Sequence, residues 1–346
     1  MKAAVVNFPA SGQSAAPSRR RLLAAGAAVG LGALWSPVQA AAPRAPVLVL
    51  NSLDGTVSVI DGNTWVELRR IATGREPHHL YMTPDEKSVI VANAGSDSLT
   101  FIDPRTAQVQ RTLAGIIDPY HLRFSPDMQW FVTAANRLNH IDLYHWDGEN
   151  PELVQRIATG KTPSHLWIDS RSTTVYASMQ DSDELVAIDL ATQRLAHRVK
   201  TGPMPADVFG TPDDRTLLVG LTGGTGVQVF ELAPGQAPRA VGQIATGKGA
   251  HAFRALGDRR HVLVSNRVAN TISQIDYATG AVVANFPAPS GPDCMDVSAD
   301  GTLIMVGSRW AGKLTLIDVA QRRVVHQVKV GKSPHGVWTL DHAGRV

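Results

Sequence analysis

The chain has 346 residues, of which 33 are basic, 30 are acidic and 44% are hydrophobic. Positions 1–40 hold four of the basic residues and no acidic one, which leaves 29 basic against 30 acidic residues in the rest of the chain. This near-neutral balance argues against nucleic acid as a principal partner, and the single cysteine, Cys294, excludes both an intrachain disulfide and a c-type haem motif.

Residues 1–40 have the features of a signal peptide that is removed on export. The stretch SRRRLL precedes an alanine- and glycine-rich apolar run over residues 24–35, and small residues at 38–40 suit a cleavage site. Paired arginines favour the twin-arginine type, and an ordinary secretory signal is the alternative. The apolar run is too short for a membrane span, and none is expected in the mature chain. We therefore expect a periplasmic protein whose folded part is residues 41–346.

From residue 47 onward the chain repeats a unit of about 43 residues. Each unit contains four short β-type segments separated by turn residues. The fourth segment ends in IATG or a related sequence, as at 71–74, 157–160 and 244–247, and the third ends in Ile-Asp, as at 57–61, 99–103, 185–189, 272–276 and 314–318. Four such segments per unit are typical of a propeller blade, and seven units account for the mature chain.

The two ends of the repeat array predict how the ring closes. The array opens with three strands, at 47–51, 56–60 and 65–71, and finishes with a lone inner strand at 333–340. Pairing the last segment with the first would complete one blade and remove the free edges. The sequence therefore predicts an all-β fold, a single seven-bladed β-propeller of four-stranded blades, and we expect a monomer.

The repeated phrase in which Pro is followed by Ser-Pro-Asp, Val-x-Asn and Val-Ile-Asp resembles the YVTN-type β-propeller repeat. That extracytoplasmic family is similar to the haem d1 propeller of cd1 nitrite reductases and to surface-layer propellers. The resemblance covers residues 47–346 and implies a fold. It does not imply one function, because propellers of this kind host several.

One position per blade recurs at spacings of 42–44 residues, at the start of the first strand. It is occupied by His79, His121, His165, Asp207, His251, Cys294 and Gly336. The preceding position holds His78, Tyr120, Ser164, Ala206, Ala250, Asp293 and His335. Six of the twelve histidines fall in these two positions. Because first strands line the central channel of a propeller, we expect these side chains to converge at one channel mouth.

Imidazole and thiol groups are preferred ligands of transition metals, so His79, His121, His165 and His251 are predicted metal ligands, with Cys294 as a soft ligand. The same set would suit an iron tetrapyrrole with arginines at its propionates, or a small anion if the imidazoles were partly protonated. Loops after the second strands are expected to rim the mouth with Asn51, Asn93, Asn136, Arg137, Asn266, Arg267, Arg309 and Trp310. The alternative is structural: the histidines bond neighbouring backbone, and Cys294 is a small buried hydrophobe.

The sequence thus predicts an exported binding or accessory protein that takes a small ligand or a periplasmic protein partner. Two alternatives are a protein-interaction platform without a cofactor, and a lactonase-like hydrolase or oxidoreductase that uses Asp207 or Asp293 beside the histidines. His140 and His145, in the stretch LNHIDLYHW, are expected to face solvent.

Overall fold

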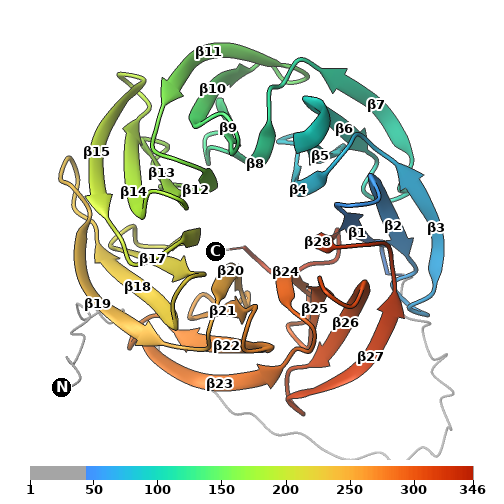
Figure 1. Cartoon of the computed structure of the whole chain (residues 1–346). Helices are drawn as coiled ribbons and strands as arrows, with labels where there is room; N and C mark the ends of the chain where they lie inside the picture. Colours follow the sequence, from blue (N-terminus) through green and yellow to red (C-terminus); the bar gives the residue numbers. More distant parts are fainter. Residues whose placement is uncertain (1–43, 346) are drawn as a thin grey trace, which may run out of the picture.

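The computed structural model describes residues 44–345 as seven four-stranded antiparallel sheets set around a ring (Figure 1). This confirms the seven-bladed propeller. The predicted signal peptide, residues 1–40, lies outside the described residues. Within residues 44–345 no helix is long and apolar enough to cross a membrane.

The first strand of each blade lies nearest the ring axis, and the other three follow outward. The first four blades comprise β28 (Pro334–Thr339), β1 (Val47–Asn51), β2 (Thr56–Ile60) and β3 (Glu67–Ala72); β4 (Pro77–Met82), β5 (Val89–Asn93), β6 (Ser98–Ile102) and β7 (Val109–Ala114); β8 (Pro119–Phe124), β9 (Trp130–Ala135), β10 (His140–Trp146) and β11 (Pro151–Ala158); β12 (Pro163–Ile168), β13 (Thr174–Met179), β14 (Glu184–Asp189) and β15 (Arg194–Lys200).

The remaining three blades follow the same order. They comprise β16 (Pro205–Gly210), β17 (Thr216–Leu221), β18 (Gly226–Glu231) and β19 (Arg239–Ala245); β20 (Ala250–Ala255), β21 (His261–Asn266), β22 (Thr271–Asp276) and β23 (Ala281–Pro287); β24 (Pro292–Val297), β25 (Leu303–Ser308), β26 (Lys313–Asp318) and β27 (Arg323–Lys329). A short 3₁₀ helix, η1 (Ala94–Ser96), follows β5.

The ring closes as the sequence predicts, because β28 pairs antiparallel with β1. Trp338 of β28 lies opposite Leu48 of β1 and is 1% exposed. It packs in one hydrophobic cluster with residues of β1, β2 and β5. The last strand of the chain is thus held by core packing as well as by backbone hydrogen bonds.

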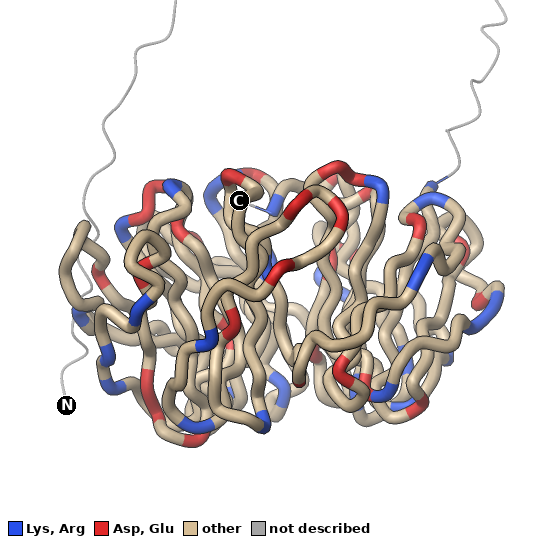
Figure 2. Tube along the Cα trace, turned by 90° about the horizontal axis from the view of Figure 1, so that it is seen from above, with Lys and Arg blue, Asp and Glu red and all other residues tan. Residues whose placement is uncertain are grey.

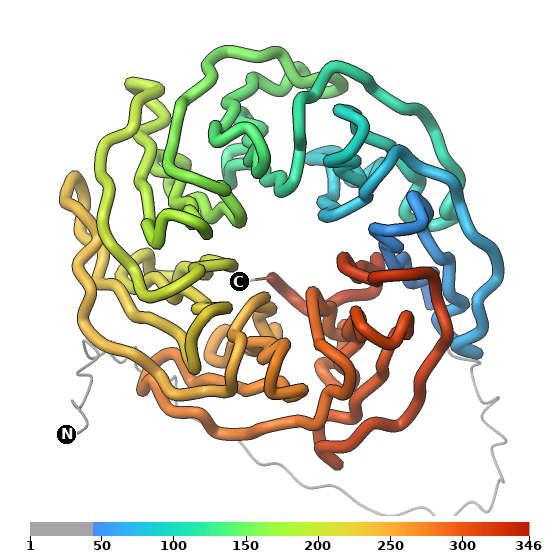
Figure 3. Tube along the Cα trace, in the orientation of Figure 1, coloured from blue at the N-terminus to red at the C-terminus, as the bar shows by residue number. Residues whose placement is uncertain are grey.

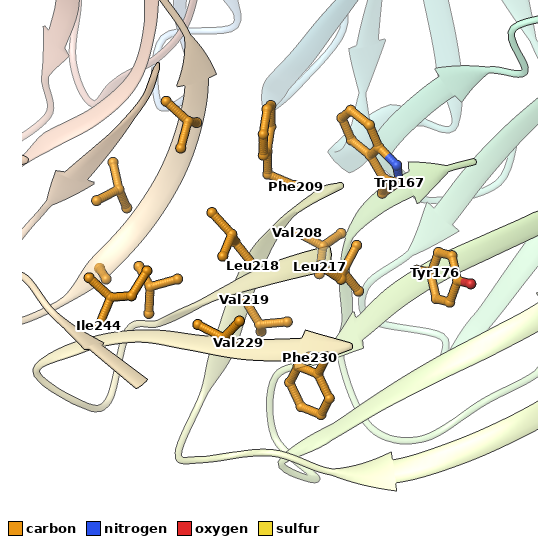
Figure 4. Close-up of a cluster of buried hydrophobic side chains, with 14 of the residues drawn as sticks. Trp167, Tyr176, Val208, Phe209, Leu217, Leu218, Val219, Val229, Phe230 and Ile244 are labelled. Carbon is orange, nitrogen blue, oxygen red and sulfur yellow. The ribbon is translucent and has the colours of Figure 1, made fainter. Parts of the chain in front are cut away.

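Burial follows strand position within a blade. Second strands such as β5 are buried along their whole length, whereas the outer strand β15 alternates between exposed and half-buried residues. Second strands contact neighbours on both faces, which explains their uninterrupted apolar sequences. Between blades, aromatic and aliphatic side chains of β12–β19 form a continuous core that includes Trp167, Phe209 and Phe230 (Figure 4).

Three asparagines predicted at the channel rim are instead fully buried and bridge strands within their blades. Asn51, Asn93 and Asn266 each end a second strand, and each Nδ2 donates to two hydroxyl groups at the start of the third strand. The glycine of IATG lies against this amide: a Cβ at Gly247 would stand 2.7 Å from the Cβ of Asn266. The repeated asparagine and glycine therefore form one packing unit, and the expectation that these amides face a ligand is wrong.

The C-terminal segment leaves β28 and runs to the centre of the ring (Figures 1 and 3). Arg254, near the far end of β20, donates to the backbone carbonyls of Ala343 and Gly344 and pairs with Asp296 of β24 at 2.8 Å. Arg345 pairs with the same carboxylate at 3.2 Å. The channel is therefore occupied at the end opposite the starts of the first strands. Acidic and basic residues alternate along the chain without a large segment of one sign (Figure 2).

Candidate metal centre

The predicted ring positions lie at the start of the inner strands β4, β8, β12, β16, β20, β24 and β28. In every blade the residue before the strand has a left-handed backbone, with φ between 45° at Asp118 and 80° at Gly249. The chain therefore turns sharply and enters the inner strand directly at the axis.

A register shift follows this turn in each of the inner strands. In the blade of β4 the pairing with β5 is regular at Pro77 and resumes at Leu80, so His78 and His79 fall within the irregular part. Successive side chains of a regular strand point to opposite faces, whereas a bulge can re-aim them. Both imidazoles consequently reach the axis, and their Nδ1 atoms are 3.0 Å apart. The residues Asp293 and Cys294 occupy the same irregular stretch in β24.

The six imidazoles of the ring form one packed cluster around His79. The ring centroid of His79 lies 4.4 Å from that of His121, 4.7 Å from that of His165 and 4.8 Å from that of His335. All six side chains are buried, and the most accessible, His121, is 9% exposed. The histidines thus fill the channel instead of lining an open funnel.

Backbone carbonyls fix the tautomers of two of these rings, because a carbonyl oxygen can only accept. His79 Nδ1 donates to the carbonyl of Tyr120 at 2.8 Å, and His335 Nδ1 donates to the carbonyl of His78 at 2.8 Å. In both rings Nε2 therefore carries a lone pair when the imidazole is neutral. A hydrogen bond from the ring nitrogen that does not face the metal is the usual means of orienting a metal-binding histidine.

Burial keeps the imidazoles neutral. It lowers the pKa of His79 and of His251 to about 4, and it places the pKa values of His78, His121, His165 and His335 well below their usual range. Burial, with Asp293 and Asp207 nearby, raises the pKa of the Cys294 thiol. Neutral imidazoles are competent metal ligands, and their neutrality argues against anion binding through partial protonation.

Three groups of side chains bring potential ligand atoms within 4.8 Å of one another: His78 with His79 and His335; His79 with His165 and Cys294; and His251 with Asp293 and His335. The first group is less suitable for a metal ion because the Nδ1 atoms of His79 and His335 already donate to backbone carbonyls. In the third, Asp293 is already paired with Arg267 at 2.6 Å and Arg309 at 2.9 Å. Burial would raise the pKa of Asp293, but Arg267 and the nearby histidines hold it well below its usual value.

The second group remains, and its geometry suits an ion. The Nε2 atoms of His79 and His165 are 3.0 Å apart, and the Sγ atom of Cys294 lies 3.8 Å from His79 Nε2. A tetrahedral zinc ion would separate two nitrogen ligands by about 3.3 Å and a nitrogen from a sulfur by about 3.5 Å. His165 is oriented in turn by Ser164, whose Oγ lies 3.0 Å from its Nδ1.

Four imidazole nitrogens in this ring have no hydrogen-bond partner among the residues that the structure describes: His121 Nδ1, His335 Nε2 and both nitrogens of His251. His251 Nε2 approaches Asp293 Oδ1 to 2.9 Å, but without the angle that a hydrogen bond requires. Each unpaired buried nitrogen costs about 1–3 kcal/mol. Such a concentration of unsatisfied acceptors and donors needs an explanation beyond packing.

Other predicted site residues lie outside this centre. Arg137 pairs with Glu76 and Asp118 on the face of the ring and makes no contact with the histidines. Asp207 accepts from the backbone N–H groups of Phe253 and Val208, at 2.7 and 2.9 Å, and burial raises its pKa to about 6. Neither Arg137 nor Asp207 forms a hydrogen bond with the ring histidines or Cys294.

The predicted exposure of His140 is wrong, and one buried ion pair was not predicted. His140 is buried, with Nδ1 3.0 Å from Asp142, at the start of β10, where it is paired with Ala135 of β9 on one side and Ala158 of β11 on the other. His145 is exposed and stacks on Trp130. Sequence reasoning also missed the Arg254–Asp296 pair. Its signal in the sequence was a charged residue at inner-strand positions where most other blades carry uncharged ones.

The fold and this centre define the class of protein, which is a closed seven-bladed β-propeller with a histidine-rich axis. The sequence matches the YNCE-like β-propeller family over residues 19–345, and the chain belongs to that family. The resemblance to the YVTN-type repeat is thus confirmed at the level of the propeller family. A search of curated protein sequences gave no significant match.

Solved structures with the same fold include three enzymes. The Pseudomonas aeruginosa periplasmic gluconolactonase PpgL is 20% identical with a TM-score of 0.72, and the match covers 87% of this chain and 99% of that one. Dihydro-haem d1 dehydrogenase NirN in complex with DHE is 15% identical with a TM-score of 0.65, over 86% and 75%. Kuenenia stuttgartiensis hydrazine synthase is 20% identical with a TM-score of 0.62, over 75% and 88%. At these identities the likeness establishes the fold alone.

Proposed function

We propose that this protein is an exported metal-binding protein that holds one transition-metal ion on the propeller axis. His79, His165 and Cys294 supply the ligand atoms. The observation that carries the proposal is the approach of the two Nε2 atoms to 3.0 Å with the Cys294 sulfur 3.8 Å from one of them, in a buried cluster of neutral imidazoles. In the metal-free state the Nε2–H of His165 donates to Nε2 of His79, so these two nitrogens are paired with each other before an ion binds.

Two other uses of the same centre are less well supported. An iron tetrapyrrole or a sugar lactone is far larger than a single ion, and six buried imidazoles already fill this end of the axis. A cleft of about 820 Å³ lies between the blades of β12–β15 and β16–β19, and none of the ring histidines lines it. At 20% identity the fold shared with PpgL does not by itself assign a lactonase site to these residues.

Export to the periplasm is part of the proposal. The signal-type sequence at residues 1–40 and the periplasmic description of PpgL support it. Twin-arginine export carries folded cargo, so an ion could be bound in the cytoplasm before the protein meets competing periplasmic metals. Expression of the full chain with Arg19 and Arg20 both changed to Lys should abolish its recovery from the periplasmic fraction. Wild-type protein found only in the cytoplasm would overturn this part.

The metal proposal is tested by elemental analysis of the exported protein after dialysis. We expect about one transition-metal ion per chain, and His165→Ala should lose it, because the variant removes one of three ligands. His326→Ala is the matched control, since His326 is an exposed histidine on the outer strand β27. Protein that takes up none of copper, zinc, nickel, cobalt or manganese, or equal uptake by His165→Ala and His326→Ala, would contradict the proposal.

A further inference from the structure

The three proposed ligands define what kind of ion the centre selects, an inference that rests on the proposed function. His79, His165 and Cys294 form an N₂S set from three different blades. His121 packs against two of these rings, at 4.4 and 4.9 Å between centroids, but its nitrogens are not grouped with the three ligand atoms. The set is therefore three-coordinate.

Ligand number and ligand type together separate structural zinc from copper. Structural zinc takes four protein ligands in a tetrahedron and catalytic zinc takes three with a water, whereas two histidines and one cysteine in a trigonal arrangement are typical of copper. Copper also binds nitrogen and sulfur sites more strongly than any other divalent ion of its row, and thiolate ligands select Cu(I) in particular. The donor set by itself thus favours copper.

The surrounding charge points the same way. Three guanidinium groups lie around the ring, those of Arg123, Arg267 and Arg309, against the two carboxyl groups of Asp207 and Asp293. The net charge of these five groups is positive whether or not Asp207 is protonated. A zinc or Cu(II) ion with one thiolate would add a further unit of positive charge to this buried region, whereas Cu(I) with one thiolate adds none.

With a single cysteine, the usual reaction in which thiols reduce bound Cu(II) to Cu(I) cannot take place within the chain. Reduction of copper by thiols needs two sulfurs to form a disulfide, and the chain has only Cys294. That residue is half-buried on the inner strand β24 of the ring. A copper–thiolate bond here could therefore persist in both oxidation states.

We propose that the centre is a mononuclear copper site of the His₂Cys type that rests as Cu(I) and exchanges one electron. Oxidation passes one electron from Cu(I)–thiolate to a one-electron acceptor and leaves Cu(II)–thiolate, and no bond to copper forms or breaks. The inner strands of three blades hold the ligands, so both oxidation states share one geometry. The exit for the electron is at His121, the most accessible imidazole of the cluster.

The test uses the full mature protein loaded with Cu(I) without oxygen and then oxidised with ferricyanide. We expect one copper per chain and a visible thiolate-to-Cu(II) absorption band that ascorbate abolishes and ferricyanide restores. Cys294→Ser should lose the band, and the matched control His326→Ala should keep it. Arg309→Gln removes one positive charge beside the centre, so its reduction potential should fall below that of the wild type.

The outcomes separate the inference from the proposed function. Absence of every metal would overturn both. One zinc per chain that equimolar Cu(I) does not displace, or bound copper without a Cys294-dependent band, would overturn the copper inference and leave the metal site in place. A potential that is unchanged or higher in Arg309→Gln would refute the charge argument. If Cys294→Ser does not fold, Ser164→Ala serves instead, with about a tenfold loss of copper affinity expected from the loss of ligand orientation.

Discussion

The buried asparagines give a prediction whose size can be worked out from the structure. Asn266→Ala removes two donated hydrogen bonds, to Thr271 at 3.1 Å and Ser273 at 2.9 Å, and one accepted from Thr246 at 2.9 Å. At about 1 kcal/mol for each bond, the variant should lose about 3 kcal/mol of unfolding free energy. Asn51→Ala should lose about as much, because Asn51 also donates twice and its Oδ1 accepts from Gly331.

Asn93 is the informative comparison. Its Nδ2 makes the same two bonds, but its Oδ1 has no partner among residues 44–345. Asn93→Ala should therefore cost about 2 kcal/mol at most and relieve one unsatisfied acceptor. The expected order of destabilisation places Asn51 and Asn266 together, above Asn93.

Chemical denaturation followed by tryptophan fluorescence measures these losses, with metal uptake recorded in parallel. Val268→Ala, an exposed change two residues beyond Asn266, is the control and should stay within about 0.5 kcal/mol of the wild type. The reasoning is refuted if Asn93→Ala is the most destabilising of the three. It is also refuted if the asparagine variants keep full stability and lose the metal, since that result would make them ligands.

Three further changes test other parts of the ring. Asp207→Asn should be less destabilising at pH 8 than at pH 5. Burial raises the pKa of Asp207 from 3.8 to about 6, so its favourable contribution is lost as pH rises through 6, and the shift sets an upper limit of about 3 kcal/mol on this pH-dependent part. At both pH values the amide NH₂ replaces one of the two oxygens that accept from the N–H groups of Phe253 and Val208. An equal effect at both pH values would contradict this pH dependence. Arg254→Met should cost about 3–5 kcal/mol in thermal or chemical unfolding, because Asp296 loses its buried partner; a neutral result would show that Arg345 suffices. Trp338→Ala should cost about 3–5 kcal/mol by cavity formation, and a loss below 1 kcal/mol would refute its part in closing the ring.

The repeat made the fold predictable. Segments such as VIVAN and LTFID have the composition and length of strands, and seven equal units permit few arrangements other than a ring. The same regularity placed one ring position at the start of each inner strand, because residues that recur once per repeat lie at regular angles around the axis of a propeller. The convergence of these residues could therefore be predicted without knowing any individual contact between distant residues.

What the sequence did not reveal depends on local irregularities. The bulge that turns both His78 and His79 inward leaves no residue signature, so an open mouth was expected where the structure has a filled one. Asn93 looked like a rim residue because second strands end near the surface, yet its amide satisfies hydroxyls of the next strand. His140 was assigned to solvent because its stretch departs from the repeat, although its neighbour Asp142 is fully buried.

The pairing of β28 with β1 also sets an order of events during synthesis. Among the strands of residues 44–345, β1 leaves the ribosome first and β28 last, so the first blade has an empty inner position until β28 has been synthesised. His335 enters the cluster on that same strand, and the tautomer of its ring depends on the carbonyl of His78. The three proposed ligands all precede β28 in the chain, but the closed ring and the full set of six imidazoles form only after β28 has been made and has paired with β1.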